Sequence, residues 1–278
     1  MSLRARLSAV RPTVVIALAT SALAAGVLVT GSADAGTAPS VPAPPAVPTS
    51  ADQIQNIDQV KTAIKGYYGD TTTTTPDPIN GTTMLHEPSP TSNWVKETNG
   101  VGREMRSYLA AQNAAHDAKA KKKVLLLDVD DTSLVTYDYE IYSNFVYNPT
   151  QNAEFVNKAV FPDVPAMLRT TQYAAGHGYT VMFLTGRPES QRAGTLLNLS
   201  KEGFPVTSAN LYLNDASAPY LASCQPSCTT TQRKSLTRQY IESKGYDIVA
   251  NVGDQYSDLN GGFADKTFKL PNPMYYLP

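Results

Sequence analysis

The fold of this chain is most clearly encoded in one short stretch, Val124-Leu125-Leu126-Leu127-Asp128-Val129-Asp130-Asp131-Thr132. It begins as a continuous apolar run, which is typical of a strand buried on both faces of a parallel sheet. The run then ends in carboxylates. Asp128 and Asp130 are two residues apart, so on an extended segment their side chains point the same way, roughly 6–7 Å apart. The stretch therefore predicts a central strand that delivers two carboxylates to one edge of a sheet.

Around this stretch the sequence alternates between strand-like runs and helical patterns. Further strands are predicted at 179–184, 210–213, 248–252 and 267–270, and helices at 162–176, 188–203 and 231–244. Upstream, the spacing of apolar residues predicts helices at 52–67 and 92–120, separated by a loop at 71–78. The second helix is expected to end in a basic, solvated stretch at 119–123. Alternating strands and helices predict an α/β fold, with a parallel sheet covered by helices on both faces.

Polar motifs recur near the predicted ends of these strands. They are Leu184-Thr185-Gly186-Arg187, then Lys234 at the start of a predicted helix, then Gly253-Asp254-Gln255-Tyr256-Ser257-Asp258. Ligand sites of such folds lie beyond the carboxyl ends of the strands. We therefore expect these motifs to meet Asp128 and Asp130 in one site.

The residue types suit phosphoryl transfer. Asp128 is the candidate nucleophile and would form an aspartyl-phosphate. Asp130 would protonate the leaving alcohol and then activate water. The Thr185 hydroxyl and the Gly186 backbone N–H would hold a phosphate oxygen, and Lys234 would neutralise the phosphate.

Each of these residues also has an ordinary structural interpretation. An Asp-x-Asp pair at a strand end is common, and Thr185 is equally suited to cap the helix that opens near Pro188. Lys234 is equally consistent with a surface lysine, and the neighbouring Arg233 competes for its role. The phosphoryl-transfer hypothesis depends on all the motifs occurring together and in this order.

Several carboxylates around a dianionic phosphate would repel it without a divalent cation. Asp254 is a hard oxygen ligand of the kind that Mg²⁺ prefers, and Asp258 lies four residues further on, where it would orient Lys234 or metal-bound waters. A helix-capping role for the aspartate is the alternative. The constellation predicts Mg²⁺ as the cofactor.

The four motifs resemble motifs one to four of the haloacid dehalogenase superfamily. The segment 245–255 and the tail 268–276 resemble its acid phosphatase branch, which includes plant vegetative storage proteins and bacterial class C acid phosphatases. The resemblance covers about residues 52–278, weakly before Lys122 and closely after it. The second aspartate of the first motif, Asp130, is absent from dehalogenase members and favours phosphate over halide chemistry.

The resemblance implies the same roles at matching positions. Asp128 would be the nucleophile and Asp130 the acid/base, while Thr185 and Lys234 would bind the phosphoryl group. Mg²⁺ would be held by Asp128, the backbone carbonyl of Asp130, and Asp254. It also implies an acid phosphatase, and the intact Asp128 weighs against a catalytically weak storage-like protein.

Between the first two motifs lies a small insertion rich in aromatic residues: Tyr137, Tyr139, Tyr142, Phe145 and Tyr147. Insertions at this place cover the active site in the superfamily that the chain resembles. Tyr137, Tyr139 and Tyr142 are therefore candidates for stacking on a nucleobase or an aryl group. The alternative, favoured for most of these residues, is that they pack the insertion onto the amino-terminal helices.

The remaining features concern export. Arg4, Arg6 and Arg11 precede an apolar run at 14–29, and Ala33-Asp34-Ala35 supplies a small-x-small cleavage pattern, so residues 1–35 are predicted to be a secretory signal cleaved near Ala35. The run is short for a membrane anchor. Residues 36–50 form a Pro- and Ala-rich linker, and 51–278 the acid phosphatase domain, with an amino-terminal helical part at 51–121 and a catalytic core at 122–278.

Cys224 and Cys228 are the only cysteines, and in an exported protein so close a pair predicts a disulfide. The chain has 278 residues and a formal net charge of −1, which argues against a nucleic-acid-binding protein. We therefore expect a secreted, Mg²⁺-dependent phosphomonoesterase acting on small organic phosphates, nucleoside monophosphates among the candidates. No nucleic-acid polymer is expected as a partner, and no membrane span after signal removal. A storage-like phosphate-binding protein and a phosphotransferase stay open as alternatives.

Overall fold

The computed structural model describes residues 50, 56–114 and 121–278. The predicted signal peptide, almost all of the linker, and residues 115–120 lie outside the described residues. The chain divides into the units Met1–Ser40 and Val41–Pro278, and all that follows concerns the second. Within the described part, we find no helix with the length and hydropathy needed to span a bilayer.

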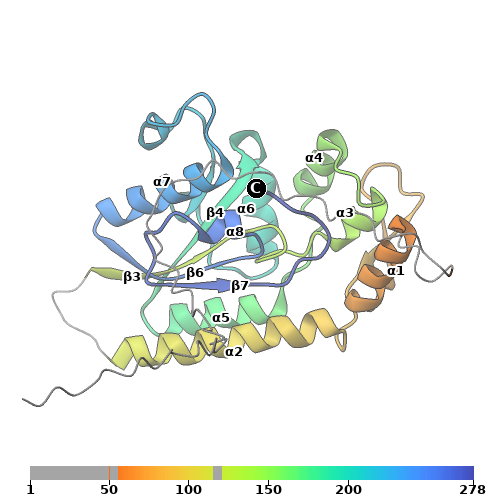
Figure 1. Cartoon of the computed structure of the whole chain (residues 1–278), viewed down its shortest axis with the longest axis horizontal. Coiled ribbons are helices and arrows are strands. Elements are labelled where there is room, and N and C mark those ends of the chain that lie inside the picture. Colours follow the sequence, from red (N-terminus) through yellow and green to blue (C-terminus); the bar gives the residue numbers. More distant parts are fainter. Residues whose placement is uncertain (1–49, 51–55, 115–120) are drawn as a thin grey trace, which may run out of the picture. The chain divides into compact units, whose positions relative to one another are not determined.

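A parallel sheet forms the centre of the described structure, with its five strands in the order β5-β4-β3-β6-β7 (Figure 1). The strands are β3 Lys122–Leu127, β4 Thr180–Pro188, β5 Leu211–Asn214, β6 Tyr246–Gly253 and β7 Lys266–Lys269. The chain runs outward from β3 to β5 and then returns to the other side of β3 for β6 and β7. The strand order thus reverses between β3 and β6, which is where open α/β sheets bind ligands. The predicted fold class is confirmed.

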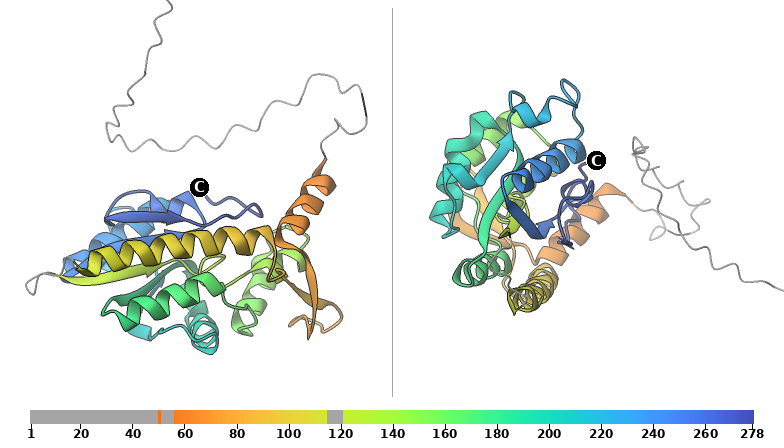
Figure 2. Two further views of the ribbon diagram at one scale, coloured as in Figure 1. Left: turned by 90° about the horizontal axis from the view of Figure 1, so that it is seen from below. Right: turned by 90° about the vertical axis from the view of Figure 1, so that its left-hand side faces the viewer.

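Both faces of the sheet are buried, as the apolar run of β3 predicts. Leu125 and Leu127 join the larger apolar core, whereas Val124 and Leu126 join a smaller core on the opposite face. The larger core includes residues of α2 (Asn93–Ala114) and α5 (Pro165–Gly176), and Ile241 of α7 (Thr230–Ser243) contributes to the smaller one. Figure 2 shows α2 and α5 side by side and α7 across the sheet from them.

The amino-terminal part differs from prediction in one element. The predicted loop at 71–78 is wrong, because β1 (Thr71–Pro76) pairs with β2 (Met84–Glu87) as an antiparallel hairpin. The β-branched threonines of β1 favour an extended backbone. The turn is held by Asp77, whose carboxylate accepts hydrogen bonds from several backbone N–H groups, among them that of Thr83 at 2.8 Å. A run of threonines was therefore a strand signal.

Helix α1 (Ile57–Tyr68) is capped by Asn56, whose Oδ1 accepts a hydrogen bond from Gln59 N at 3.0 Å, and it ends at Gly69 with φ 63°. The expectation of a basic helix end at 119–123 is wrong in its described part, because Lys122 and Lys123 already belong to β3.

The insertion after β3 is helical, which the sequence analysis did not predict. It contains α3 (Tyr137–Tyr142) and α4 (Pro149–Asn157), the latter capped by Asn148. Further along, β4 continues to Pro188, so α6 begins only at Arg192 and runs to Lys201, and α8 is the short helix Tyr256–Leu259. Three 3₁₀ turns complete the described elements: η2 Glu189–Gln191, η3 Ser208–Asn210 and η4 Pro219–Leu221.

Candidate active site

Asp128 lies directly after β3, at the centre of the carboxyl edge of the sheet. Its backbone is fixed on both sides, because its N–H donates to Val252 O at 3.0 Å and its carbonyl accepts from Ser133 Oγ at 2.6 Å. Its Oδ1 accepts a hydrogen bond from Lys234 Nζ at 2.5 Å, and no hydrogen bond to Oδ2 occurs among the described residues. Burial raises the pKa of Asp128 to about 7, against the opposing effect of Lys234. One oxygen is thus anchored and the other is free to react.

Lys234 lies in the second turn of α7, later than predicted, because the helix begins at Thr230 behind a Thr229 cap. Its side chain is buried and contacts both Asp128 and Asp258. Burial lowers the pKa of Lys234, but the two carboxylates outweigh burial and hold it above its ordinary value. Arg233 does not compete for these contacts, since its guanidinium donates to Cys228 O at 3.0 Å. Lys234 is therefore a fixed positive charge beside Asp128.

A cluster of carboxylates faces this pair. Oxygens of Asp128, Asp254 and Asp258 lie within 4.8 Å of one another, and all three residues are buried. Burial, and then the charges of Asp258 and Asp128, raise the pKa of Asp254 well above its ordinary value. Three carboxylates with one lysine leave excess negative charge, and hard oxygen donors suit a divalent cation. The donor set therefore fits a divalent metal. The cluster contains Asp258, whereas the predicted third ligand, the carbonyl of Asp130, remains a prediction.

Neighbouring amides orient Asp254. Its Oδ2 accepts hydrogen bonds from Gln255 Nε2 and Asn272 Nδ2, both at 2.7 Å, and Thr132 Oγ1 lies 3.3 Å from its Oδ1. Asn272 comes from the carboxyl-terminal tail, and sequence reasoning gave it no role. Its only signal was its place in the tail that carries the family resemblance. Such outer partners fix the direction of a metal-binding carboxylate.

Asp258 has two roles that the sequence analysis treated as alternatives. Its Oδ2 accepts a hydrogen bond from Gln255 N at 2.9 Å and so caps α8, while its Oδ1 contacts Lys234. A Cβ on Gly253 would overlap the Asp258 side chain, so the glycine of this motif is needed for the close approach. Gly253, the last residue of β6, thus leaves room for the Asp258 side chain, and Asp258 in turn contacts Lys234.

Asp130 is held by Arg187, the last residue of the Leu184-Thr185-Gly186-Arg187 motif, which had no predicted role. Arg187 Nη2 lies 2.6 Å from Asp130 Oδ1, and Arg187 Nε lies 3.1 Å from both Asp130 oxygens. Arg187 Nη1 donates to Thr195 Oγ1 at 3.1 Å, which fixes the guanidinium in place. The Asp130 side chain stays 31% exposed, whereas that of Arg187 is 4% exposed. The buried Arg187 guanidinium therefore orients the Asp130 carboxylate, which still reaches solvent.

Thr185 and Gly186 lie within the last residues of β4. Thr185 is buried, and its Oγ1 accepts a hydrogen bond from Arg187 N at 3.1 Å. It does not cap a helix, since α6 begins only at Arg192. Gly186 lines the cleft. The hydroxyl proton of Thr185 is not committed by this bond and is available for a phosphate oxygen.

A cleft of about 500 Å³ joins these residues. Its lining includes the candidate reactive residues Asp128, Asp130, Gly186, Arg187, Lys234, Asp254 and Asp258. It also includes residues of the helical insertion and the tail: Tyr139, Glu140, Phe145, Tyr147, Asn152, Tyr275, Tyr276 and Leu277. The reactive groups and several aromatic side chains thus line the same cleft.

The three tyrosines proposed to stack on a substrate have different surroundings in the structure. Tyr137 is fully buried and stacks on Tyr68 of α1, with ring centroids 4.6 Å apart. Tyr142 packs against Phe155 at 5.3 Å. Tyr137 thus packs onto the amino-terminal helix α1, as the packing alternative expects, whereas Tyr142 packs within the insertion. Neither lines the cleft, so their expected place beside a substrate is corrected. Tyr139 lines the cleft, but its hydroxyl accepts from Asn148 N at 2.7 Å and its ring is almost wholly buried, so it forms the floor.

The carboxyl-terminal tail is tied to the site through Asp131. Tyr275 Oη donates to Asp131 Oδ2 at 2.7 Å, and Thr136 N donates to Oδ1 at 3.0 Å. Asp131 has φ 51°, a left-handed conformation that aspartate tolerates better than most residues. Further along, Leu277 N donates to Gln255 Oε1 at 3.1 Å. The tail is therefore a wall of the cleft.

The predicted disulfide is confirmed, since Cys224 and Cys228 are bonded with Cα atoms 4.8 Å apart. The loop that it closes supplies the Cys228 carbonyl that holds Arg233 at the cleft. The disulfide thus supports one edge of the site.

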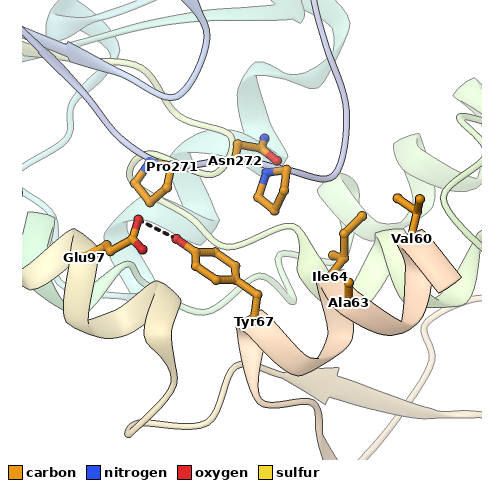
Figure 3. A pocket seen from close by; sticks show the side chains of 8 residues that line it. Val60, Ala63, Ile64, Tyr67, Glu97, Pro271 and Asn272 are labelled. Atoms are coloured by element: carbon orange, nitrogen blue, oxygen red, sulfur yellow. Dashed lines mark hydrogen bonds between the residues drawn. The ribbon is translucent and has the colours of Figure 1, made fainter. Parts of the chain in front are cut away.

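A second cavity, of about 550 Å³, lies between α1 and the tail (Figure 3). Its walls are mostly apolar, and its one carboxylate, Glu97, accepts a hydrogen bond from Tyr67 Oη at 2.8 Å. Asn272 lines this cavity and also contacts Asp254. The reactive groups described above line the first cleft, and so the second cavity is not the candidate active site.

Comparison with known proteins agrees with this geometry. Residues 85–278 match the model of the family described as HAD superfamily, subfamily IIIB (Acid phosphatase). The chain is 36% identical over 161 residues to Stem 28 kDa glycoprotein of Glycine max, a match that covers 56% of this chain and 61% of that protein. It is 32% identical over 201 residues to Acid phosphatase 1 of Solanum lycopersicum, covering 68% and 76% of the two chains.

Among solved structures, the class C acid phosphatase from Bacillus anthracis is similar, with a TM-score of 0.51 and 22% identity over 65% of this chain and 80% of that one. This likeness concerns the fold alone. The soybean match spans about three-fifths of that relative's length. The family model covers well over half of the chain. The chain therefore belongs to the haloacid dehalogenase superfamily, subfamily IIIB, the acid phosphatase subfamily.

Proposed function

We propose that this chain is an exported, Mg²⁺-dependent phosphomonoesterase that acts through Asp128. One observation carries the proposal. A buried carboxylate at the switch point of the sheet has one oxygen held by Lys234 at 2.5 Å and the other free toward a cleft, opposite two further carboxylates. Family membership supports the same activity.

In the first step, the free oxygen of Asp128 attacks phosphorus, and the bond from phosphorus to the leaving oxygen breaks. The proton of Asp130 goes to that leaving oxygen, which departs as an alcohol. Lys234, held between Asp128 and Asp258, offsets negative charge on the transferring group. Arg187 keeps Asp130 aimed at the cleft.

In the second step, the Asp130 carboxylate takes a proton from water, and the resulting oxygen attacks the aspartyl-phosphate. The bond between Asp128 and phosphorus breaks, which restores the carboxylate and releases phosphate. The same residue thus gives and then takes one proton, so the cycle balances. The backbone N–H of Gly186 and the hydroxyl of Thr185 would hold phosphate oxygens through both steps.

Asp128 and Asp254 would bind the metal, with the carbonyl of Asp130 as the third protein ligand. A bound Mg²⁺ supplies positive charge that offsets the phosphate and the clustered carboxylates. Asn272 and Gln255 would keep Asp254 directed at it. Export is supported by the Cys224–Cys228 disulfide, because such bonds persist in oxidising compartments.

The test is hydrolysis of p-nitrophenyl phosphate at mildly acidic pH, with Mg²⁺ and with EDTA. The wild type should turn over with Mg²⁺ and stop in EDTA, and Asp128→Asn should be inactive while it remains folded. Asp58→Asn, an exposed residue of α1, is the matched control. Wild-type activity in Asp128→Asn would refute the mechanism, and full activity in EDTA would refute the metal.

The same assay separates the two alternatives. A storage-like, phosphate-binding protein would bind phosphate without turnover in the folded wild type. A phosphotransferase given an alcohol acceptor would release more p-nitrophenol than inorganic phosphate, because part of the phosphoryl group goes to the acceptor. Hydrolysis alone releases both in equal amounts.

A further inference from the structure

Glu140 is a buried acid in the cleft that neither the fold nor the proposed mechanism uses. It belongs to α3, is only 7% exposed, and lines the cleft together with several aromatic residues. Within the described residues its carboxylate has no hydrogen bond and no ion pair. Its oxygens are not among the fully enclosed side-chain atoms that lack a partner, so the carboxylate keeps some accessible surface in the cleft, where a ligand can reach it.

The backbone holds Glu140 in this position. Its N–H donates to Thr136 O at 3.1 Å, and its carbonyl accepts from Phe145 N at 2.7 Å. Asn144 and Phe145 have φ of 56° and 59°, a left-handed conformation that a bulky residue such as Phe adopts rarely. This strained turn closes α3 and puts Phe145 into the cleft wall beside Glu140. Strain of this kind is concentrated at functional sites.

The surroundings of Glu140 define what would fit there. Phe145, Tyr147 and Tyr276 supply aromatic rings to the same cleft, and the last two are largely exposed. Asn152 supplies an amide. Aromatic faces favour a flat ring, while a carboxyl and an amide favour hydrogen-bonding groups at the rim of that ring.

Burial, and then the charges of Asp131 and Asp130, raise the pKa of Glu140 to about 8. In mildly acidic solution the carboxyl is therefore neutral, with one O–H donor and free acceptor positions. It adds no negative charge to a cleft that must admit a phosphate. A neutral carboxyl can also form two hydrogen bonds with a ligand ring whose edge carries a donor next to an acceptor.

We propose that Glu140 determines which leaving alcohol is accepted, by selecting phosphomonoesters whose alcohol carries a flat ring with N–H and C=O groups along its edge. The inference rests on the proposed phosphomonoesterase activity. The residues around Asp128 and Lys234 bind the phosphate of every ester. Glu140 distinguishes among the groups that are attached to it.

The discrimination has a physical basis. A ring without polar edge groups would cover the Glu140 carboxyl and leave it unpaired, which costs free energy. A site built around a hydrogen-bonding group rejects analogues that lack it. We expect the substrate with a polar edge to lose at least about tenfold in kcat/KM, relative to the plain ring, when the carboxyl is removed.

The experiment compares guanosine 5′-monophosphate, which has a polar edge, with phenyl phosphate, which has none. The readout is the ratio of their kcat/KM values in the wild type, Glu140→Leu and Glu140→Gln. The ratio should fall at least about tenfold in Glu140→Leu and stay within about threefold in Glu140→Gln, whose amide is also a donor and an acceptor. Glu154→Leu, the same change at an exposed position of α4, should leave the ratio unchanged.

A ratio in Glu140→Leu within about twofold of the wild type would overturn the proposal, as would equal losses with both esters. Glu140→Ala replaces the leucine variant if the latter does not fold. A binding measurement separates this inference from the activity on which it rests. In an Asp128→Asn background, calorimetry gives the Kd of each ester without turnover.

If the wild type hydrolyses neither ester, the proposed function fails, and the calorimetry still decides the role of Glu140. A Kd for guanosine 5′-monophosphate at least about tenfold weaker with Glu140→Leu, and a smaller change for phenyl phosphate, supports it. Equal affinities with and without the carboxyl, or no binding of the nucleotide at all, overturn it.

Discussion

The stability of this protein should fall as the pH rises from about 4.5 to 8, and Glu140→Gln should remove a defined part of that fall. Burial, with the charges of Asp131 and Asp130, raises the pKa of Glu140 from 4.5 to about 8. Between these values the folded chain keeps a proton that the unfolded chain has released. Stability therefore decreases with pH across this window, since the folded state binds more protons.

The size of the effect follows from the two pKa values. With a pKa of 4.5 in the unfolded chain and about 8 in the folded one, the contribution of Glu140 drops by about 3.5 kcal/mol between pH 5 and pH 8. Glutamine has the same shape and does not titrate. The difference in unfolding free energy between pH 5 and pH 8 should thus be smaller in Glu140→Gln by this amount.

The assay is urea unfolding of both proteins at pH 5 and pH 8 in EDTA, so that metal binding does not contribute. Carboxylates remote from Glu140 titrate in both proteins alike and cancel in the comparison, whereas those beside it, Asp131 and Asp138 among them, are coupled to its charge. Glu154→Gln, an exposed residue of α4, is the control for the substitution itself. A difference between wild type and Glu140→Gln of less than about 1 kcal/mol would refute the assignment of a raised pKa to this side chain.

Three further outcomes are expected. Lys234→Met should lower the unfolding free energy by about 3 kcal/mol or more, because Asp128 and Asp258 lose their buried partner. Denaturant unfolding at neutral pH measures this, and an unchanged midpoint contradicts it. Asn272→Leu should weaken Mg²⁺ binding about 10- to 100-fold in calorimetry, because Asn272 orients Asp254. A Kd equal to that of the wild type excludes this positioning role. Replacing both Cys224 and Cys228 with serine should lower the unfolding free energy by about 2 kcal/mol at most, since the loop is short. A larger loss in thermal unfolding contradicts this.

The sheet, and the position of Asp128, Asp130 and Asp254 at its carboxyl edge, could be predicted because both depend on local sequence patterns. The apolar run before Asp128 and the alternation of strands with helices place β3 and β6 without any tertiary information. The hairpin β1–β2 and the helices α3 and α4 were missed for local reasons too. Repeated threonines followed by Pro76-Asp77-Pro78 are equally typical of an exposed loop, and a six-residue helix such as α3 is too short to give a clear period.

The pairing of side chains could be predicted only in part. Lys234 and Asp128 are 106 residues apart in the sequence, and only their common position at a strand edge connected them. Asp130 with Arg187, 57 residues apart, and Asp254 with Asn272, 18 residues apart, are further pairs whose second member carried no assigned role. In the aromatic insertion, no local pattern distinguishes a residue that lines the cleft, such as Phe145, from one buried against Tyr68, such as Tyr137.

By itself, the sequence determined the fold class, the strand that carries Asp128, and the residue types from which a phosphoryl-transfer site can be built. Only the tertiary structure decided which groups face one another and which are removed from water. Backbone patterns arise from interactions between residues near in sequence, so they can be read locally. The pKa values of Asp128 and Glu140, the orientation of Asp130 and the shape of the cleft depend instead on desolvation and charge contributed by segments far apart in the chain.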